Sequence, residues 1–395
     1  MDKLPEGWIE TSIENLCRLV TDGAHKTPRY TEDGVPFLSV KNITKGFIDF
    51  SDTRFISKEE HFELIRRCKP EKNDILYTKV GTTGIAKLID TEKDFSLFVS
   101  LALLKPDSTK INSVFFEYQL NSPHVYSQAQ RKTRGVANRN LVIRDIKSLC
   151  LQVPPLPEQK RIVSNLNALF ERIDQSIALL EENIKHTEAL MASALDEVFG
   201  EIDQEKFLPL LEICSPSKET LIPIDNEEYN YVGLENIQSN TGRIINFSRT
   251  EGKNIKSTKV RFKRGAVLYG KLRPYLNKVY VADFDGIATT EIMPFQTRKD
   301  LLNASFLAYF LRSPRFVALV NQYTSGARMP RATTTFFKKV AKVPVIPLNS
   351  QEKIVKKLDS YSKSIEGLLQ EQKSKLNHLK SLKESILDKA FKGEL

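Results

Sequence analysis

The sequence reads Pro155-Leu156-Pro157-Glu158-Gln159-Lys160-Arg161-Ile162-Val163 and, 192 residues later, Pro347-Leu348-Asn349-Ser350-Gln351-Glu352-Lys353-Ile354-Val355. The residues that follow align at the same spacing, without a gap, for more than thirty positions. Upstream the similarity is fainter, although Asp74–Val80 still matches Ala266–Leu272. A repeat of this length indicates that the chain contains two copies of one unit, each a mixed segment followed by a helix.

The repeated segments have the pattern of long amphipathic helices. Residues 158–199 contain neither proline nor glycine, and apolar residues recur there at spacings of three and four. A helix of that length would extend about 60 Å, too far to bury its stripe against a small domain. We therefore expect the two helices to pair as a coiled coil. The residues expected to pair the helices or dock partners are Ile162, Leu166, Ile173, Leu180, Ile354, Leu358, Ile365 and Leu379.

The stripe also includes Leu169, Tyr361 and Leu368, whereas Gln372 interrupts it. A glutamine at that point either fixes the register or marks an exposed stretch, and we favour exposure.

The repeat predicts the architecture. We expect an α+β protein with two mixed α/β domains, at 1–157 and 201–348, joined and separated by antiparallel helices at 158–200 and 349–395. The two copies would be related by an approximate two-fold axis. The alternative is that both helices belong to one globular domain, but the position of one helix after each mixed segment argues against it.

The charge of the chain favours a polyanionic partner. The 395 residues carry a net charge of +10, with −4 on residues 158–199 and +3 on residues 350–395, so the mixed segments carry +11. No apolar run is long enough for a membrane span, and the N-terminus lacks the apolar core of a signal peptide. The four cysteines lie far apart, as in proteins of a reducing compartment. We expect a cytoplasmic protein.

Polar, basic loops in the mixed segments are candidate DNA contacts. Strands are expected at Ile75–Tyr77 and Val267–Tyr269, with loops after them and further basic loops at 131–140 and 325–331. Arginine, lysine and asparagine can bind G O6/N7 or A N6/N7. For any single residue the alternative is a solvated surface charge. The candidate residues are Lys79, Lys87, Arg134, Asn138, Arg139, Lys271, Arg273, Asn277, Lys278, Arg328 and Arg331.

The sequence lacks several signatures of catalysis. It has no phosphate-binding Gly-x-x-x-x-Gly-Lys-Ser/Thr loop, no Asp/Asn-Pro-Pro-aromatic motif of an amino-methyltransferase and no metal-ligand spacing among its histidines and cysteines. We expect neither catalytic residues nor a metal site.

Five stretches together resemble a known family. They are Leu4–Trp8, Asp22–Pro28, Gly34–Val40, Pro154–Val163 and Leu387–Leu395. On these residues the chain resembles the specificity subunit of type I restriction-modification systems over essentially its whole length. The second copy departs at Asn349-Ser350, where the first has Pro157-Glu158, and this should weaken only the start of the second helix.

The resemblance implies a non-catalytic subunit with two target-recognition domains, each of which reads one half of a split, asymmetric DNA site. It also implies that the helices set the spacing of the half-sites and dock two methyltransferase subunits, which restriction subunits join. S-adenosylmethionine, ATP and magnesium would belong to those partners, so that this chain binds no cofactor. Three alternatives stay open: a type IIB-like partner set, a non-specific nucleic-acid-binding coiled-coil protein, and a DNA methyltransferase or nuclease with an unrecognised active site.

Overall fold

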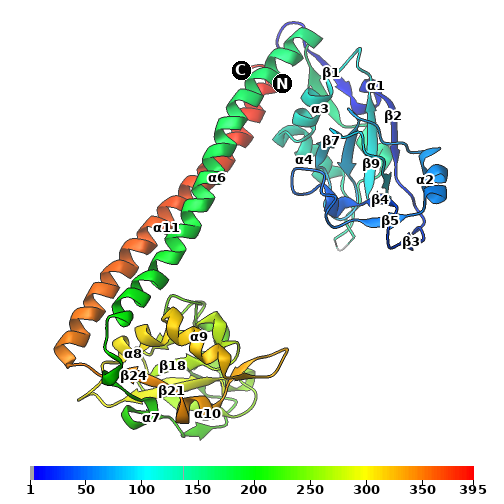
Figure 1. Ribbon diagram of the computed structural model, residues 1–395. Helices are drawn as coiled ribbons and strands as arrows, with labels where there is room; N and C mark the ends of the chain where they lie inside the picture. The colour runs from blue at the N-terminus through cyan, green and yellow to red at the C-terminus, as the bar shows by residue number, and fades with distance from the viewer. Residues whose placement is uncertain (1–3, 137) are drawn as a thin grey trace. The chain divides into compact units, whose positions relative to one another are not determined.

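The computed structural model describes residues 4–136 and 138–395 (Figure 1). The chain forms two compact units: unit 1 comprises residues 1–180 with 374–395, and unit 2 comprises residues 181–373. Each unit contains one mixed segment and a part of both long helices. This confirms the predicted fold class of mixed α/β segments with long helices.

Unit 1 contains two four-stranded sheets and a short third one. The first sheet is antiparallel with the order β2-β9-β6-β7, the second has the order β3-β5-β4-β8, and β1 pairs with β10. The strands are β1 (Ile9–Ser12), β2 (Cys17–Asp22), β3 (Tyr30–Thr31), β4 (Val35–Leu38), β5 (Arg54–Ile56), β6 (Ile75–Thr78), β7 (Ala86–Leu88), β8 (Ser96–Leu97), β9 (Leu101–Pro106) and β10 (Cys150–Val153). The short helices are α1 (Ile13–Leu16), η1 (Val40–Asn42), α2 (Lys58–Ile65), α3 (Ser113–Leu120), α4 (Pro123–Lys132) and α5 (Ile143–Lys147).

Unit 2 repeats the first sheet and varies the second. Its first sheet has the order β12-β21-β18-β19 and its second the order β13-β17-β20-β15, while β11-β24, β14-β16 and β22-β23 are separate pairs. The strands are β11 (Phe207–Pro209), β12 (Cys214–Pro216), β13 (Thr220–Leu221), β14 (Glu228–Tyr229), β15 (Tyr231–Val232), β16 (Thr250–Glu251), β17 (Lys259–Phe262), β18 (Val267–Gly270), β19 (Val279–Val281), β20 (Gly286–Ala288), β21 (Ile292–Thr297), β22 (Thr324–Ser325), β23 (Arg331–Ala332) and β24 (Lys342–Pro344). The helices are η2 (Gln204–Lys206), α7 (Leu210–Ile213), η3 (Leu234–Asn236), η4 (Gly252–Asn254), η5 (Pro274–Leu276), α8 (Ala304–Leu311), α9 (Pro314–Gln322) and α10 (Thr334–Lys339).

One of the two inner strands of each first sheet, β6 or β18, lies between two apolar cores. In β6, Ile75 and Tyr77 point into the core shared with α3 and the long helices, whereas Leu76 points into the core shared with the second sheet. In β18, Val267 and Leu268 divide in the same way. A strand that is covered on both faces is apolar throughout, which explains why both strands were recognisable in the sequence.

Local capping fixes the helices that follow the sheets. The side chain of Asn112 caps α3, and Ser122, before Pro123, caps α4. Asn303 and Ser313-Pro314 do the same for α8 and α9. Proline is tolerated in the first turn of a helix because its missing N–H would be unpaired there. Each Ser-Pro pair therefore lies where one helix ends and the next begins.

The long helices are α6 (Leu156–Gly200) and α11 (Leu348–Ala390), which run antiparallel to each other in both units (Figure 1). In unit 1, Lys383 Nζ lies 2.7 Å from Asp174 Oδ1; in unit 2, Lys373 Nζ lies 3.2 Å from Glu188 Oε1. No helix in the described part of the chain is long and apolar enough to cross a membrane.

A buried glutamine ties the start of each long helix to its unit. Gln159 Oε1 accepts the backbone N–H of Asn112 at 2.7 Å, and its Nε2 donates to two carbonyl oxygens. Gln351 makes the equivalent three bonds, with the N–H of Asn303 at 2.8 Å. Both side chains are fully buried. Because this anchor is retained, α11 begins at the same position of the repeat as α6, despite Asn349-Ser350.

Most, but not all, of the residues assigned to the pairing stripe are shielded from solvent. The residues Ile162, Leu166, Ile173, Leu180, Ile354, Leu358, Ile365 and Leu379 are all buried or half-buried. In contrast, Leu169, Tyr361 and Leu368 are exposed, so their assignment to the stripe was wrong. The expectation that Gln372 is exposed was also wrong, since its side chain is half-buried and donates to Thr187.

Candidate nucleic-acid interface

Two loops that are distant in the sequence are joined in unit 1. The turn loop (residues 79–87) follows β6 and includes the start of β7, and the hairpin loop (residues 131–140) begins at the C-terminal end of α4. The N–H of Gly81 donates to the carbonyl of Arg139 at 2.9 Å, and the N–H of Leu141 donates to the carbonyl of Lys79 at 2.7 Å. The two basic loops predicted in this segment therefore form one surface.

The same backbone pairing occurs in unit 2 between its turn loop (residues 271–278) and its hairpin loop (residues 324–332). The N–H of Arg273 donates to the carbonyl of Pro330 at 2.7 Å, and the N–H of Ala332 donates to the carbonyl of Lys271 at 3.0 Å. These bonds match those of unit 1 position by position along the repeat. Both copies therefore present a turn loop and a hairpin loop as one surface.

The two turn loops have different residue types at the positions where the backbone is left-handed. In unit 1 the left-handed positions are Gly81 and Gly84, with φ of 82° and 91°. In unit 2 the corresponding bends are formed by Arg273 and Asn277, both with φ of 51°. A non-glycine residue in this region costs about 1–2 kcal/mol. Strain of this kind is concentrated at functional sites, where the surrounding structure maintains it.

The side chain of Asn277 helps to maintain the strained bend. Its Nδ2 donates to the carbonyl of Arg312 at 2.9 Å. Arg273 has no such internal role: its side chain is exposed, and no hydrogen bond or ion pair holds it within the described residues. Tyr275, between Arg273 and Asn277 in the sequence, is also exposed on the turn. It was not among the residues selected from the sequence. An exposed arginine on a fixed backbone is suited to bind a partner.

The hairpin loops turn at glycines. Gly135 and Gly326 have φ of 86° and 92°. A Cβ on Gly135 would lie 2.5 Å from the carbonyl oxygen of Asn138, so that position admits only glycine. The loop tips expose an apolar residue, Val136 in unit 1 and Met329 in unit 2. Ala137, which follows Val136 in the sequence, lies outside the described residues.

Two predicted contact residues of unit 1 are held by internal ion pairs. Lys79 is buried, with its Nζ 2.9 Å from Asp22 Oδ2, and Lys87 Nζ lies 2.8 Å from Glu117 Oε1. Burial raises the pKa of the Asp22 carboxyl, but hydrogen bonds from Lys79 and His25 outweigh burial and lower its pKa below the usual value. Both lysines therefore fix the turn loop from its base.

The remaining candidates of unit 1 lie on the hairpin loop. Arg134 is exposed, with one guanidinium nitrogen 3.4 Å from Asp145 Oδ2. Arg139 donates to the side chain of Gln130, and Asn138 is exposed. Their polar groups are open to solvent beside the turn loop, so they form the accessible basic edge of unit 1.

The candidates of unit 2 divide in the same way. Lys278 Nζ donates to the carbonyl of Leu234 at 2.6 Å, and Arg331 Nε lies 3.0 Å from Glu291 Oε1. Lys271 is half-buried and Arg328 is exposed, and neither side chain has a polar partner within the described part of the chain. Unit 2 thus offers Arg273, Arg328 and Lys271 as uncommitted cations.

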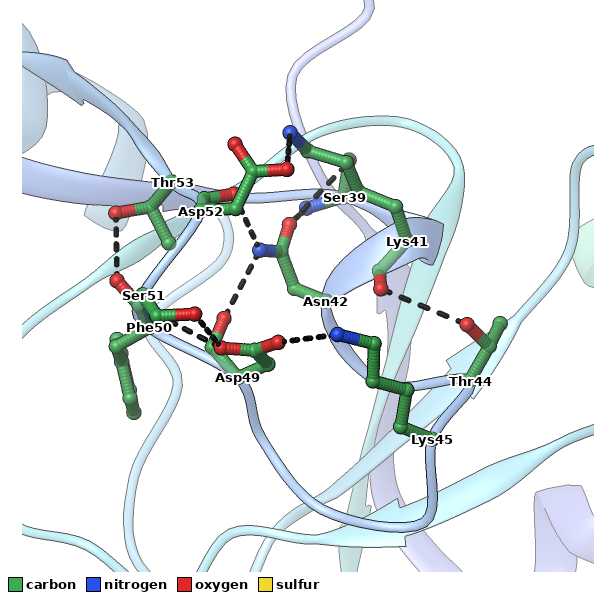
Figure 2. Close-up of polar contacts among 10 residues, drawn as sticks. All are labelled: Ser39, Lys41, Asn42, Thr44, Lys45, Asp49, Phe50, Ser51, Asp52 and Thr53. Atoms are coloured by element: carbon green, nitrogen blue, oxygen red, sulfur yellow. Dashed lines mark hydrogen bonds and ion pairs between the residues drawn. The ribbon is translucent and has the colours of Figure 1, made fainter. Parts of the chain in front are cut away.

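An asparagine-clamped loop, which the sequence reasoning also missed, lies in each second-sheet region. In unit 1, Asn42 Oδ1 accepts the N–H of Ser39, and its Nδ2 donates to the carbonyls of Asp49 and Asp52 (Figure 2). In unit 2, Asn236 accepts the N–H of Gly233 and donates to two carbonyls in the same manner. The repeated Asn-Ile pair at 42–43 and 236–237 was the available signal.

Ion pairs close the loop of unit 1. Lys45 Nζ lies 2.9 Å from Asp49 Oδ2, and Lys41 Nζ lies 3.0 Å from Asp52 Oδ2 (Figure 2). Hydrogen bonds from Ser51 and Lys45 hold the pKa of Asp49 well below its usual range. These lysines are partly neutralised, which distinguishes this loop from the open hairpin-loop edge.

The comparisons with known proteins agree on one family. A family model described as the type I restriction modification DNA specificity domain matches residues 5–185 and 210–378. The EcoBI specificity subunit of Escherichia coli is 28% identical over 203 residues, which cover 50% of this chain and 43% of that protein. The EcoDI specificity subunit, also from Escherichia coli, is 23% identical, and the matched part is 63% of its length. The chain thus spans less than two thirds of these two relatives.

Other relatives match over the full length. The putative MjaX specificity subunit of Methanocaldococcus jannaschii is 21% identical over 427 residues, covering 100% of this chain and 95% of that protein. A chain solved in work on complex assembly and conformational transition of the type I R-M system has a TM-score of 0.74 at 21% identity, with both chains covered completely. The HsdS subunit from Thermoanaerobacter tengcongensis has a TM-score of 0.55 at 20% identity, with 100% and 98% covered. These two structures share the fold.

Proposed function

The chain belongs to the family of type I restriction-modification specificity subunits, and on that premise we propose that its two units read the two halves of a split, asymmetric DNA site. The observation that carries the proposal is the pairing of a turn loop with a hairpin loop in both units. The backbone hydrogen bonds are shared, but the side chains that the loops expose are different. Two surfaces that share a backbone arrangement but expose different side chains are suited to bind two different DNA sequences.

In unit 2, Arg273 is the first candidate for a base contact. Its guanidinium is exposed and uncommitted, and its backbone is fixed in the left-handed region by the hydrogen bond to Pro330. Arginine binds guanine O6 and N7 through two parallel hydrogen bonds, which discriminate against other bases by about 1–3 kcal/mol. Arg328 and Lys271 provide further cations beside it. In unit 1 the corresponding contacts come from Arg134, Asn138 and Arg139.

The internally paired residues have a supporting role in this proposal. Lys79, Lys87, Lys278 and Arg331 hold the loops in place, and Asn277 fixes the strained bend. Their effect on DNA binding would be indirect, through the position of the exposed arginines.

The helices would set the separation of the half-sites and dock two methyltransferase subunits, which restriction subunits join. Outward-facing apolar residues support docking, because exposed apolar groups on a helix favour a protein partner. The exposed residues are Leu169, Leu179, Leu190, Tyr361, Leu368 and Leu382. S-adenosylmethionine, ATP and magnesium would be bound by the partner subunits, and this chain would catalyse no reaction itself.

Binding by the complete complex tests the proposal. Arg273→Ala should lower the preference for the cognate site over a site altered at one base pair by about 1–3 kcal/mol, or 5- to 150-fold. Lys299→Ala is the matched control, since Lys299 is an exposed cation of unit 2 outside both loops. If Arg273→Ala instead weakens binding to all duplexes equally, the residue contacts phosphate and does not read sequence.

Catalysis is tested with the purified chain alone. We expect no transfer of label from S-adenosylmethionine to DNA until methyltransferase subunits are added. Methylation by the chain, with contaminating partners excluded, would contradict the proposed division of labour.

A further inference from the structure

A polar contact interrupts the apolar pairing of α6 with α11 in unit 2. Gln372 Nε2 donates to Thr187 Oγ1 at 3.1 Å, while the Thr187 hydroxyl donates to the carbonyl of Asn183 at 2.8 Å. Thr187 is only 6% exposed, and Gln372 Oε1 is buried without a partner among the described residues. A polar layer in a coiled coil lowers stability but can determine which helices pair.

The sequence repeat gives this layer a counterpart in unit 1. Antiparallel pairing aligns Thr187 with Gln372, and continued by one heptad it aligns Leu180 with Leu379. The ion pair of Asp174 with Lys383 in unit 1 is consistent with this alignment. The 192-residue repeat relates Leu180 to Gln372, and Thr187 to Leu379. One layer is therefore polar on both helices, and its counterpart is leucine on both.

Pairing of like helices from two copies would destroy this match. Two α6 helices in the same alignment would bring Thr187 opposite Leu180 twice, and two α11 helices would bring Gln372 opposite Leu379 twice. Thr187 keeps its hydrogen bond to Asn183 in an α6–α6 pair, but Gln372 opposite Leu379 loses the partner of its buried amide. Because the two halves are present in equal amounts, α6–α6 pairs can form only together with these unfavourable α11–α11 pairs. An unsatisfied buried polar group is costly, whereas a paired one is close to neutral.

We propose that the Thr187–Gln372 contact is a partner-selecting device, which makes α6 accept α11 and reject the α6 of a second copy of this chain. This selection means that the helix pair joins two different units and does not join two copies of the same unit. Charge supports the same choice, since residues 158–199 carry −4 and residues 350–395 carry +3. The two contributions are separable, because salt screens exposed charges far more than it affects a buried hydrogen bond.

The test uses the complete chain with a protease site inserted after Glu201, so that both halves are present when the folded protein is cut. After equilibration at about 1 M salt, where charge effects are small, native mass spectrometry counts mixed pairs and same-half pairs. The wild type should remain in mixed pairs. Thr187→Leu with Gln372→Leu should raise the ratio of same-half to mixed pairs by about tenfold or more, because all four combinations then place leucine opposite leucine.

A second variant changes the preference in the opposite sense. Leu180→Gln would place a glutamine opposite Thr187 in an α6–α6 pair and opposite Leu379 in the native pair, so it should favour α6–α6 pairs. Leu179→Gln is the matched control, because Leu179 precedes Leu180 in the sequence but its side chain is 62% exposed. The double leucine variant should keep or raise the melting temperature, which separates a selecting role from a merely stabilising one.

Equal pair distributions in the wild type, the double leucine variant and Leu180→Gln would overturn the proposal. Same-half pairs in the cut wild type would also overturn it. If the double leucine variant does not fold, Leu180→Gln and its control decide the question alone.

Discussion

The two units share the contacts that hold them to the long helices and differ in what they expose. Gln159 and Gln351 make the same three hydrogen bonds. Tyr118 donates to Asn167 at 2.7 Å, and Tyr309 donates to Asp359 at 2.6 Å, again at matching positions of the repeat. What faces the helices has been retained, because both units must present the same attachment to the same kind of helix.

The differences lie in the second sheet and in the loops. In unit 1, β4 lies between β5 and β8; in unit 2, β15, which corresponds to β4 in the repeat, lies at the sheet edge beyond β20. Unit 1 has α2 where unit 2 has none among its described residues. The turn loops bend at glycines in one unit and at Arg273 and Asn277 in the other. The same backbone arrangement of the loops is therefore compatible with different second sheets beside it and with different exposed side chains.

The largest expected effect is on the shared anchor. Gln159→Ala should destabilise unit 1, and Gln351→Ala unit 2, each by about 3–5 kcal/mol, since one buried backbone N–H and two carbonyls lose their partner. Denaturant unfolding followed by hydrogen exchange would assign the loss to one unit. Gln175→Ala and Gln370→Ala, at exposed positions of the same helices, are the controls. A loss of less than about 1 kcal/mol would show that water replaces the anchor.

A smaller effect is expected from the ion pair that only unit 1 has. Asp22→Asn should cost about 2–3 kcal/mol at neutral pH, because it leaves Lys79 buried without its carboxylate. The folded pKa of Asp22 is lowered, so its contribution is present above the unfolded value of about 3.9 and is lost as pH falls through the folded pKa. The stabilities of variant and wild type should therefore converge in acid. A difference that persists unchanged once Asp22 is protonated in the folded protein would contradict this account.

The smallest effects, of opposite sign, are expected at the bends of the turn loops. Gly81→Ala should cost about 1 kcal/mol through its positive φ alone, because a Cβ there meets no atom within 4 Å. Arg273→Gly should raise stability by up to about 1 kcal/mol because it relieves the same strain. Thermal unfolding measures both. Effects of equal sign would show that the two bends are not equivalent.

Much of the fold could be predicted from the sequence because it depends on short-range patterns. The apolar runs at 75–77 and 267–269 predict strands that are covered on both faces. The 192-residue repeat predicts two copies of one unit, and the spacing of three and four predicts α6 and α11. The helix stripe failed at Leu169, Tyr361 and Leu368, because apolar residues beside a heptad seam resemble those within it.

The candidate site was less accessible, because it depends on contacts between distant segments. Nothing local shows that the carbonyl of Arg139 pairs with Gly81, or that Lys79 is neutralised by Asp22. The exposed Tyr275 and the strained conformation of Arg273 are also consequences of tertiary structure. Residue type alone therefore marked loops that the structure brings together in each unit, without separating buried cations from exposed ones.

The central claim is that each unit reads its own half of the DNA site. Mapping of methylated bases in cells carrying the complete complex tests it with Arg139→Ala, which changes the hairpin loop of unit 1, and Arg273→Ala, which changes the turn loop of unit 2. Each variant should relax one base position, in opposite half-sites, and leave the other half-site and the spacing unchanged. If both variants relax the same half-site, or if either lowers methylation at all sites without a change in sequence, the assignment of one half-site to each unit is contradicted.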